Sequence, residues 1–162
     1  MRRFFFLMLI VFTAACLPEK NGNKADRIVF EKETIRIFDQ NLNRKKVEIN
    51  VEIADTESKR MRGLMYRTEL ADNAGMLFLF PTNRKISMWM ANTPVSLDMI
   101  FIDERGRIQE IAENTVPFSH DVIRSENKAI SVLEIKGGLS KHFNLQLGDI
   151  VEHPFFKLEK AK

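Results

Sequence analysis

The chain of 162 residues has only one cysteine, Cys16, which lies near the start of the sequence. A chain with a single cysteine cannot form an internal disulfide, so a buried apolar core must hold its fold together. The roughly 145 residues that follow Cys16 are enough for one single-domain core.

The sequence also lacks an excess of charge of one sign. It has 25 lysine and arginine residues against 22 aspartate and glutamate residues. Because Arg2 and Arg3 belong to a predicted leader, 23 basic and 22 acidic residues remain in the mature chain. A protein that binds nucleic acid is expected to carry a basic patch, and we therefore predict no nucleic-acid partner.

Familiar metal and catalytic motifs are missing as well. His120, His142 and His153 fit no zinc-ligand spacing, and there is no His-Glu-x-x-His motif. The sequence has no glycine-rich phosphate loop and no nucleophile elbow. We predict no metal site and no cofactor.

The chain does have one apolar run, in its opening residues "MRRFFFLMLIVFTAAC". Two arginines, the apolar run from Phe4 to Phe12 and small residues form the three parts of a secretory signal peptide. The run is about half the roughly 20 residues that a spanning helix needs. With its cysteine, the arrangement resembles a bacterial lipoprotein signal, in which the cysteine becomes the lipidated first residue. The alternative is an ordinary cleavage site beside an incidental cysteine.

These features predict the cellular location and the domain organisation of the protein. We predict a signal peptide over residues 1–15, a lipidated Cys16 with a polar tether over residues 16–26, and a single domain over residues 27–157. Leu17, rather than an aspartate, follows the cysteine, and in a bacterium with two membranes this indicates the outer membrane. The protein is thus predicted to be an extracytoplasmic lipoprotein of the cell envelope, bound to the membrane through the lipid.

Strand-like alternation dominates the rest of the chain. In "KKVEINVEIAD", Val47, Ile49, Val51 and Ile53 alternate with polar residues, a pattern typical of a half-buried strand. Further strands are predicted at "IRIFD", "GMLFLF", "ISMWM", "SLDMIFI", "RIQEIAE", "AISVLEI" and "DIVEH", and "DERG" predicts a hairpin turn.

One segment has helical spacing instead. Met61, Leu64 and Met65 recur at intervals typical of a helix, and Asp55 or Thr56 can cap its start. We therefore predict a mainly β fold, a single-domain antiparallel β-sandwich or jelly-roll-like barrel, with one short helix at about residues 56–66.

The only tryptophan, Trp89, lies on the wetter side of its predicted strand, beside Lys85 and Ser87. Met88 and Met90 lie on the apolar side. A tryptophan in this position is either covered by a loop or exposed as a platform on which a ligand stacks.

Two acids, Asp98 and Glu134, lie in otherwise apolar strands. A buried carboxylate needs hydrogen-bond donors or a cation, so Asp98 either pins a loop or holds a ligand. The two acids would form a catalytic pair if their carboxyl groups lay about 5 to 9.5 Å apart. The donors near Asp98 in the sequence are Asn92 and Thr93, with Arg62 and Arg67 as candidates by charge.

Methionines are frequent between residues 61 and 99. Thioethers are good ligands for Cu(I), but methionine is also a common core filler, and no methionine run pairs with a histidine. Core packing is therefore the prediction for Met61, Met65, Met76, Met88, Met90 and Met99.

Six blocks occur in order along the chain: "RGLMYR", "GMLFLF", "WMANT", "LDMIF", "LE" at residues 133–134 and "GD" at residues 148–149. This series resembles the domain-of-unknown-function 192 family (uncharacterised protein family 0127), from about Val47 to Val151. The resemblance implies a compact, mainly β domain and brings no established activity. Departures from the family pattern are Met88, where an aromatic residue is usual, and Ala91, where a basic residue is usual. The matching positions are Arg62, Gly63, Met65, Gly75, Met76, Trp89, Met90, Asn92, Thr93, Asp98 and Glu134.

These observations favour a module that binds a glycan, a peptide or an envelope protein, or a small molecule. The rival hypotheses are a hydrolase of envelope polymers that uses Asp98 and Glu134, and a purely structural envelope component. The predicted ligand-binding residues are Trp89, Asn92, Thr93 and Asp98, with Arg62 and Glu134 beside them.

Overall fold

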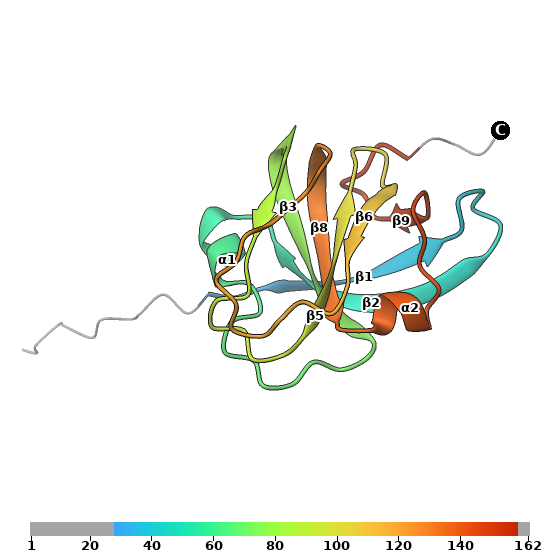
Figure 1. The fold of residues 1–162 in the computed structure, drawn as a ribbon. Coiled ribbons are helices and arrows are strands. Elements are labelled where there is room, and N and C mark those ends of the chain that lie inside the picture. Colours follow the sequence, from blue (N-terminus) through green and yellow to red (C-terminus); the bar gives the residue numbers. More distant parts are fainter. Residues whose placement is uncertain (1–27, 159–162) are drawn as a thin grey trace, which may run out of the picture.

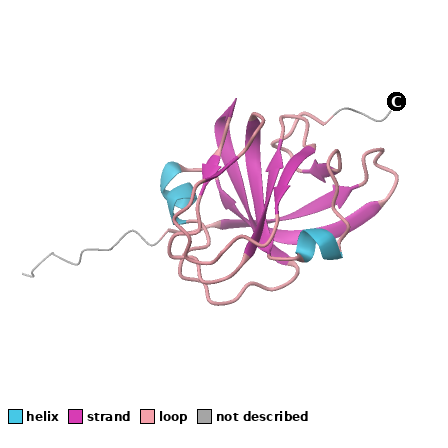
Figure 2. Ribbon diagram, in the orientation of Figure 1, coloured by secondary structure: helices cyan, strands magenta, loops and turns pink. Residues whose placement is uncertain are grey.

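The computed structural model describes residues 28–158, which fold mainly into strands (Figure 1). Two short helices lie on different sides of the strands (Figure 2). The elements are β1 (Glu31–Phe38), β2 (Lys45–Ala54), α1 (Glu57–Arg62), β3 (Ala74–Arg84), β4 (Ser87–Met88), β5 (Leu97–Ile102), β6 (Ile108–Ala112), β7 (Ile123–Arg124), β8 (Ala129–Lys136), α2 (Leu139–His142) and β9 (Ile150–Glu152).

Seven of the strands form one sheet in the order β6-β5-β8-β3-β2-β1-β9, and β4 pairs separately with β7. The large sheet curls until its two ends meet, where Arg107, the residue before β6, forms an isolated bridge with Ile150 in β9. Hydrogen bonds from Ile108 N to Asp149 O (2.9 Å) and from Val151 N to Gly106 O (2.8 Å) join the same ends. The curled sheet therefore forms a barrel-like wall.

Apolar side chains cover both faces of this sheet. Every strand of the sheet contributes to the inner cluster, which fills the inside of the curl: Ile35, Ile37, Ile49, Val51, Ile53, Leu77, Ile100, Ile102, Ile108, Leu133, Ile135, Leu139, Leu145, Val151 and Phe156. The outer cluster joins β3, β5 and β8 to the turn after α1 and to the loops that cover them: Ala54, Leu64, Met76, Phe78, Phe80, Ile86, Met88, Met90, Leu97, Met99, Phe101, Ala129 and Val132. Two layers of core thus lie against one sheet.

The pairing of β2 with β3 is parallel, with Val51 opposite Gly75, whereas all other strand pairs run antiparallel. A parallel pair needs a long crossover rather than a hairpin. Residues 55–73 supply this crossover, and they carry α1 beside β3 (Figure 1).

The prediction of a mainly β single domain is confirmed. The sheet is one curled sheet, which corresponds to the barrel alternative rather than to two stacked sheets, and its one parallel pair departs from the antiparallel prediction. The predicted "DERG" turn joins β5 to β6, and Gly106 adopts a φ of 77° there. The segments α2 and β7 were not predicted, and "ISMWM" yields only the two-residue β4.

The predicted helix at residues 56–66 is shorter than expected. It ends at Arg62 because Gly63 takes a φ of 47° and a ψ of −143°, outside the helical region. The predicted signal peptide, lipidated Cys16 and tether lie outside the described residues. Within residues 28–158, no helix has the length and apolar character needed to cross a membrane.

Candidate functional site

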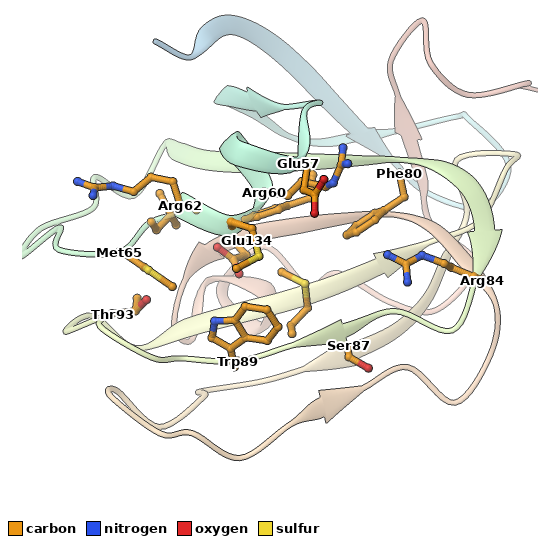
Figure 3. Close-up of a pocket in the computed structure, with 15 residues that line it drawn as sticks. Glu57, Arg60, Arg62, Met65, Phe80, Arg84, Ser87, Trp89, Thr93 and Glu134 are labelled. Atoms are coloured by element: carbon orange, nitrogen blue, oxygen red, sulfur yellow. The ribbon is translucent and has the colours of Figure 1, made fainter. Parts of the chain in front are cut away.

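A pocket of about 370 Å³ opens where α1 and the turn after it meet the outer face of β3 and β8 (Figure 3). One wall comes from the segment that holds β4 and Trp89. Its lining residues are Glu57, Arg60, Met61, Arg62, Gly63, Leu64, Met65, Phe78, Phe80, Arg84, Ser87, Met88, Trp89, Thr93 and Glu134.

The end of α1 packs directly on the sheet. Thr56 caps the helix start, since its Oγ1 accepts a hydrogen bond from Lys59 N at 3.3 Å. At the helix end, a Cβ on Gly63 would lie 3.2 Å from Phe78 Cζ. Glycine therefore lets the backbone approach the sheet closely, and Leu64 and Met65 follow as lining residues.

The opposite wall presents Trp89 to the pocket. Ile86 N donates to Ser125 Oγ at 2.9 Å, and this bond ties the wall to the loop outside it. Met88 is 8 % exposed and Met90 is 1 % exposed, whereas Trp89 keeps 38 % of its surface exposed. Figure 3 shows its ring facing the interior of the pocket. Trp89 is therefore exposed to the pocket rather than covered by a loop, and stacking of a ligand on it stays a prediction.

Asn92 connects the two walls rather than lining the pocket. Its carbonyl accepts a hydrogen bond from Tyr66 N at 2.8 Å, and its Nδ2 lies 4.0 Å from Met65 Sδ. Asn92 and Tyr66 both have positive φ values, 57° and 66°, so each turn is tightly bent at this junction. Asn92 thus holds Met65 close to the wall of Trp89, and the neighbouring Thr93 is the residue of this turn that lines the pocket.

Glu134 lies at the floor of the pocket, in the middle of the sheet. In the sheet register it lies between Met76 of β3 and Met99 of β5, and both methionines are fully buried. The side chain is 4 % exposed, and no group within residues 28–158 forms a hydrogen bond or ion pair with it. Burial raises the pKa of Glu134 to about 8, so the neutral carboxyl predominates at pH 7.

Asp98 is a correction to the predicted site, because it lies on the opposite face of the sheet. It pairs with Ile135, one residue further along β8 than Glu134, and side chains alternate between faces. Its Oδ1 accepts from Asn114 N (2.7 Å) and Gly138 N (3.0 Å). Its Oδ2 accepts from the backbone N (2.9 Å) and the hydroxyl (2.6 Å) of Ser140.

Asp98 therefore pins two loops, and it is not part of the corner formed by Trp89 and Asn92. The same geometry contradicts the predicted catalytic pair, since Asp98 and Glu134 cannot reach one bond from opposite faces of a sheet. Arg62 and Arg67 do not contact Asp98 either. The Arg62 guanidinium stacks 4.7 Å from the centroid of the Tyr66 ring, and Arg67 pairs with Glu52 through two hydrogen bonds.

Arginines surround the mouth of the pocket. The guanidinium carbons of Arg60 and Arg84 each lie 5.3 Å from the centroid of the Phe80 ring. Arg60 also donates from its Nη1 to two backbone carbonyls, those of Asp55 (2.6 Å) and Leu79 (2.8 Å). In Figure 3, Arg84 points across the pocket mouth, whereas Arg62 points away from it.

The prediction of core packing is confirmed for four of the six methionines. Met76, Met88, Met90 and Met99 are buried core residues. Met61 and Met65 are not, and together with Met88 they line the pocket. Met61 is 54 % exposed. Residues 28–158 contain no cluster of three or more His, Cys, Asp or Glu side chains that could hold a metal ion.

Sequence reasoning found Arg62, Trp89, Thr93 and Glu134 but missed several other lining residues. The alternation in "GMLFLF" contains a usable signal, because it places Phe78 and Phe80 on the same face as Met76. The arginines at positions 60 and 84 gave no local signal, since they reach the pocket through the crossover and the end of β3.

Comparisons with known proteins give a family and a fold. A family model described as "Uncharacterized ACR", domain of unknown function 192, matches residues 39–153. A solved structure from Sinorhizobium meliloti 1021, described as a proposed transcription regulator, is 38% identical with a TM-score of 0.76, covering 80% of this chain and 99% of that one. A protein of unknown function from Novosphingobium aromaticivorans DSM 12444 is 32% identical with a TM-score of 0.68, covering 75% of this chain and 85% of that one. No curated protein matches the chain.

A structural role for Asp98 predicts that Asp98→Asn is strongly destabilising. The amide nitrogen cannot accept hydrogen bonds, so two of the four donors lose their partner, and we expect the free energy of unfolding to fall by roughly 2–4 kcal/mol. Chemical denaturation at pH 7 measures this change. The control is Glu48→Gln, because the Glu48 side chain is half exposed and its replacement should lower stability far less. Equal effects of the two substitutions would contradict the assigned role.

The raised pKa of Glu134 predicts a specific dependence of stability on pH. Between pH 4.5 and pH 8 the unfolded chain loses the Glu134 proton while the folded protein keeps it, so stability falls as pH rises. Glu134→Gln removes this titration. The free energy of unfolding of the wild type should therefore fall by roughly 3 kcal/mol relative to the variant between about pH 5 and pH 7. A difference between the two proteins that is constant across this range would show that Glu134 is ionised in the fold.

Proposed function

The chain belongs to the domain-of-unknown-function 192 family, and from the pocket that it builds we propose that the protein is a ligand-binding module of the cell envelope. The observation that carries the proposal is Glu134, a carboxyl group that is 4 % exposed, has no hydrogen-bond partner within residues 28–158 and faces an open pocket. Its oxygens are not among the fully buried atoms that lack a partner, so they are reached from the pocket. A ligand group that enters the pocket would supply a hydrogen-bond partner.

The walls are suited to hold the rest of such a ligand. Trp89 offers an exposed aromatic face, and Met65, Met88 and Phe80 offer apolar contacts close to it. Methionine side chains adapt to different shapes, and small-molecule sites typically combine an apolar lining with a few placed polar groups. Binding is favoured over hydrolysis because the predicted partner acid, Asp98, lies on the other face of the sheet and is fully hydrogen-bonded.

The envelope location is proposed from the first 16 residues. Their two arginines, apolar run and terminal cysteine are the features of a lipoprotein signal. A lipid on Cys16, followed by a tether over residues 16–26, would hold the pocket close to a membrane surface.

Ligand binding is testable with probes already in the chain. We expect a small molecule with an apolar ring and one polar group to shift the fluorescence of Trp89, the only tryptophan. The same molecule should shift the ¹³C-methyl NMR signals of Met61, Met65 and Met88, which line the pocket. The signal of Met90, a core residue whose sulfur accepts a hydrogen bond from Thr115, should move least. A panel of neutral, cationic and anionic compounds that moves none of these signals would support a purely structural role instead.

Lipidation is testable separately in intact cells. In a bacterial host given an alkyne-labelled fatty acid, the wild-type chain should take up the label and sediment with membranes. Cys16→Ser should take up no label and should be released from the membrane fraction. An unlabelled wild-type chain that sediments no more than the variant would contradict the proposed anchor.

A further inference from the structure

Three arginines at the pocket lack a carboxylate partner. Lys46 and Arg67, which are partly buried, are ion-paired with Asp149 (2.6 Å) and Glu52. Arg60 is also partly buried, and Arg62 and Arg84 are exposed, but none of the three has a carboxylate partner within residues 28–158. All three line the pocket.

The partners that these arginines do have leave their positive charge uncompensated. Arg60 and Arg84 stack on Phe80, and Arg62 stacks on Tyr66. An aromatic ring stabilises a guanidinium without neutralising it. The guanidinium of Arg84 makes no hydrogen bond within the described chain, so its donors are available to a molecule in the pocket. A further cation, Arg124, donates to Ser87 Oγ at 3.3 Å, and Ser87 also lines the pocket.

The negative charges that face the same space are fewer. Glu57, in the first turn of α1, is the one other acid that lines the pocket besides Glu134. The strands beside Glu134 add no charge, since Met76 and Met99 are its neighbours in the sheet. When Glu134 is neutral, Arg60 and Arg84 bring two positive groups to the pocket against the one negative group of Glu57, since Arg62 points away. A molecule that enters therefore experiences a positive potential.

We infer that the pocket selects a small amphipathic organic anion, with its apolar part against Trp89 and its carboxylate facing Arg84 and Arg60. This inference rests on the proposed function, since it names the class of ligand for the same pocket. Arginine binds a carboxylate through paired, charge-assisted hydrogen bonds. Neutral Glu134 does not repel such an anion, whereas its ionised form would.

Three probes that share one apolar part separate the contributions of charge and shape. They are 3-phenylpropanoate, 3-phenylpropanamide and 3-phenylpropylamine, which are anionic, neutral and cationic near pH 7. Each is titrated into the purified full-length protein while Trp89 fluorescence and the methionine methyl signals are recorded. We expect the propanoate to bind most tightly, by roughly tenfold or more over the amide.

Two variants test the residues that carry the inference. Arg84→Gln should weaken propanoate binding roughly tenfold or more and leave amide binding nearly unchanged. The control is Arg44→Gln. Arg44 belongs to the hairpin between β1 and β2, and this hairpin lies far from α1 (Figure 1). Thermal unfolding of each variant checks that it is folded. In addition, propanoate affinity should fall as pH rises through about 8 in the wild type and should stay level in Glu134→Gln.

The outcomes distinguish this inference from the proposed function. Binding of the amide or the amine as tightly as the propanoate would overturn the selection of an anion while leaving a binding pocket in place. An unchanged propanoate affinity in folded Arg84→Gln would also overturn the selection of an anion and leave a binding pocket in place. If none of the three probes, and nothing in the wider panel of neutral, cationic and anionic compounds, moves Trp89 or the pocket methionines, the proposed binding function itself fails.

Discussion

The parallel pairing of β2 with β3 is the constraint from which the pocket follows. Two adjacent parallel strands cannot be joined by a tight turn, so the chain must leave the sheet and return at the end where β2 began. Residues 55–73 make this return across the outer face of the sheet and carry α1 with them. Phe78 and Phe80 lie on that face and are only 2 % and 6 % exposed. The crossover covers them and creates the space between α1 and the wall of Trp89.

Covering the outer face also determines the environment of Glu134. β8 is a central strand between β3 and β5, so both of its faces are buried once the crossover and the loop with β4 are in place. A leucine or methionine at position 134 would pack there without an electrostatic cost. A carboxyl group lowers stability at neutral pH by its desolvation, and groups of this kind concentrate where proteins bind or transform other molecules. This cost is the reason that Glu134 carries the proposed ligand-binding function.

The sequence allowed the class of fold to be predicted because the alternation in β2, β5 and β8 is a local property. It did not allow the parallel pairing of β2 with β3 to be predicted, since strands in parallel and antiparallel pairs show the same alternation. For the site, Trp89 and Glu134 stood out as residues that conflict with their local pattern. Arg60 and Arg84 could not be found in this way, because they reach the pocket only through the pairing of distant segments.

Asp98 and Glu134 show why a local pattern is insufficient to assign a role. Both are single acids in apolar strands, yet the supply of backbone donors around them differs. Asp98 lies near the start of β5, where the loop at Asn114 and the turn before α2 have N–H groups that no ladder uses. Glu134 lies between two paired strands, whose N–H groups are already engaged in the ladders on either side. Backbone N–H groups are thus available to a carboxylate at the end of a strand but not to one in the middle of the sheet. Within residues 28–158, the Glu134 carboxyl can therefore gain a partner only from the side of the pocket.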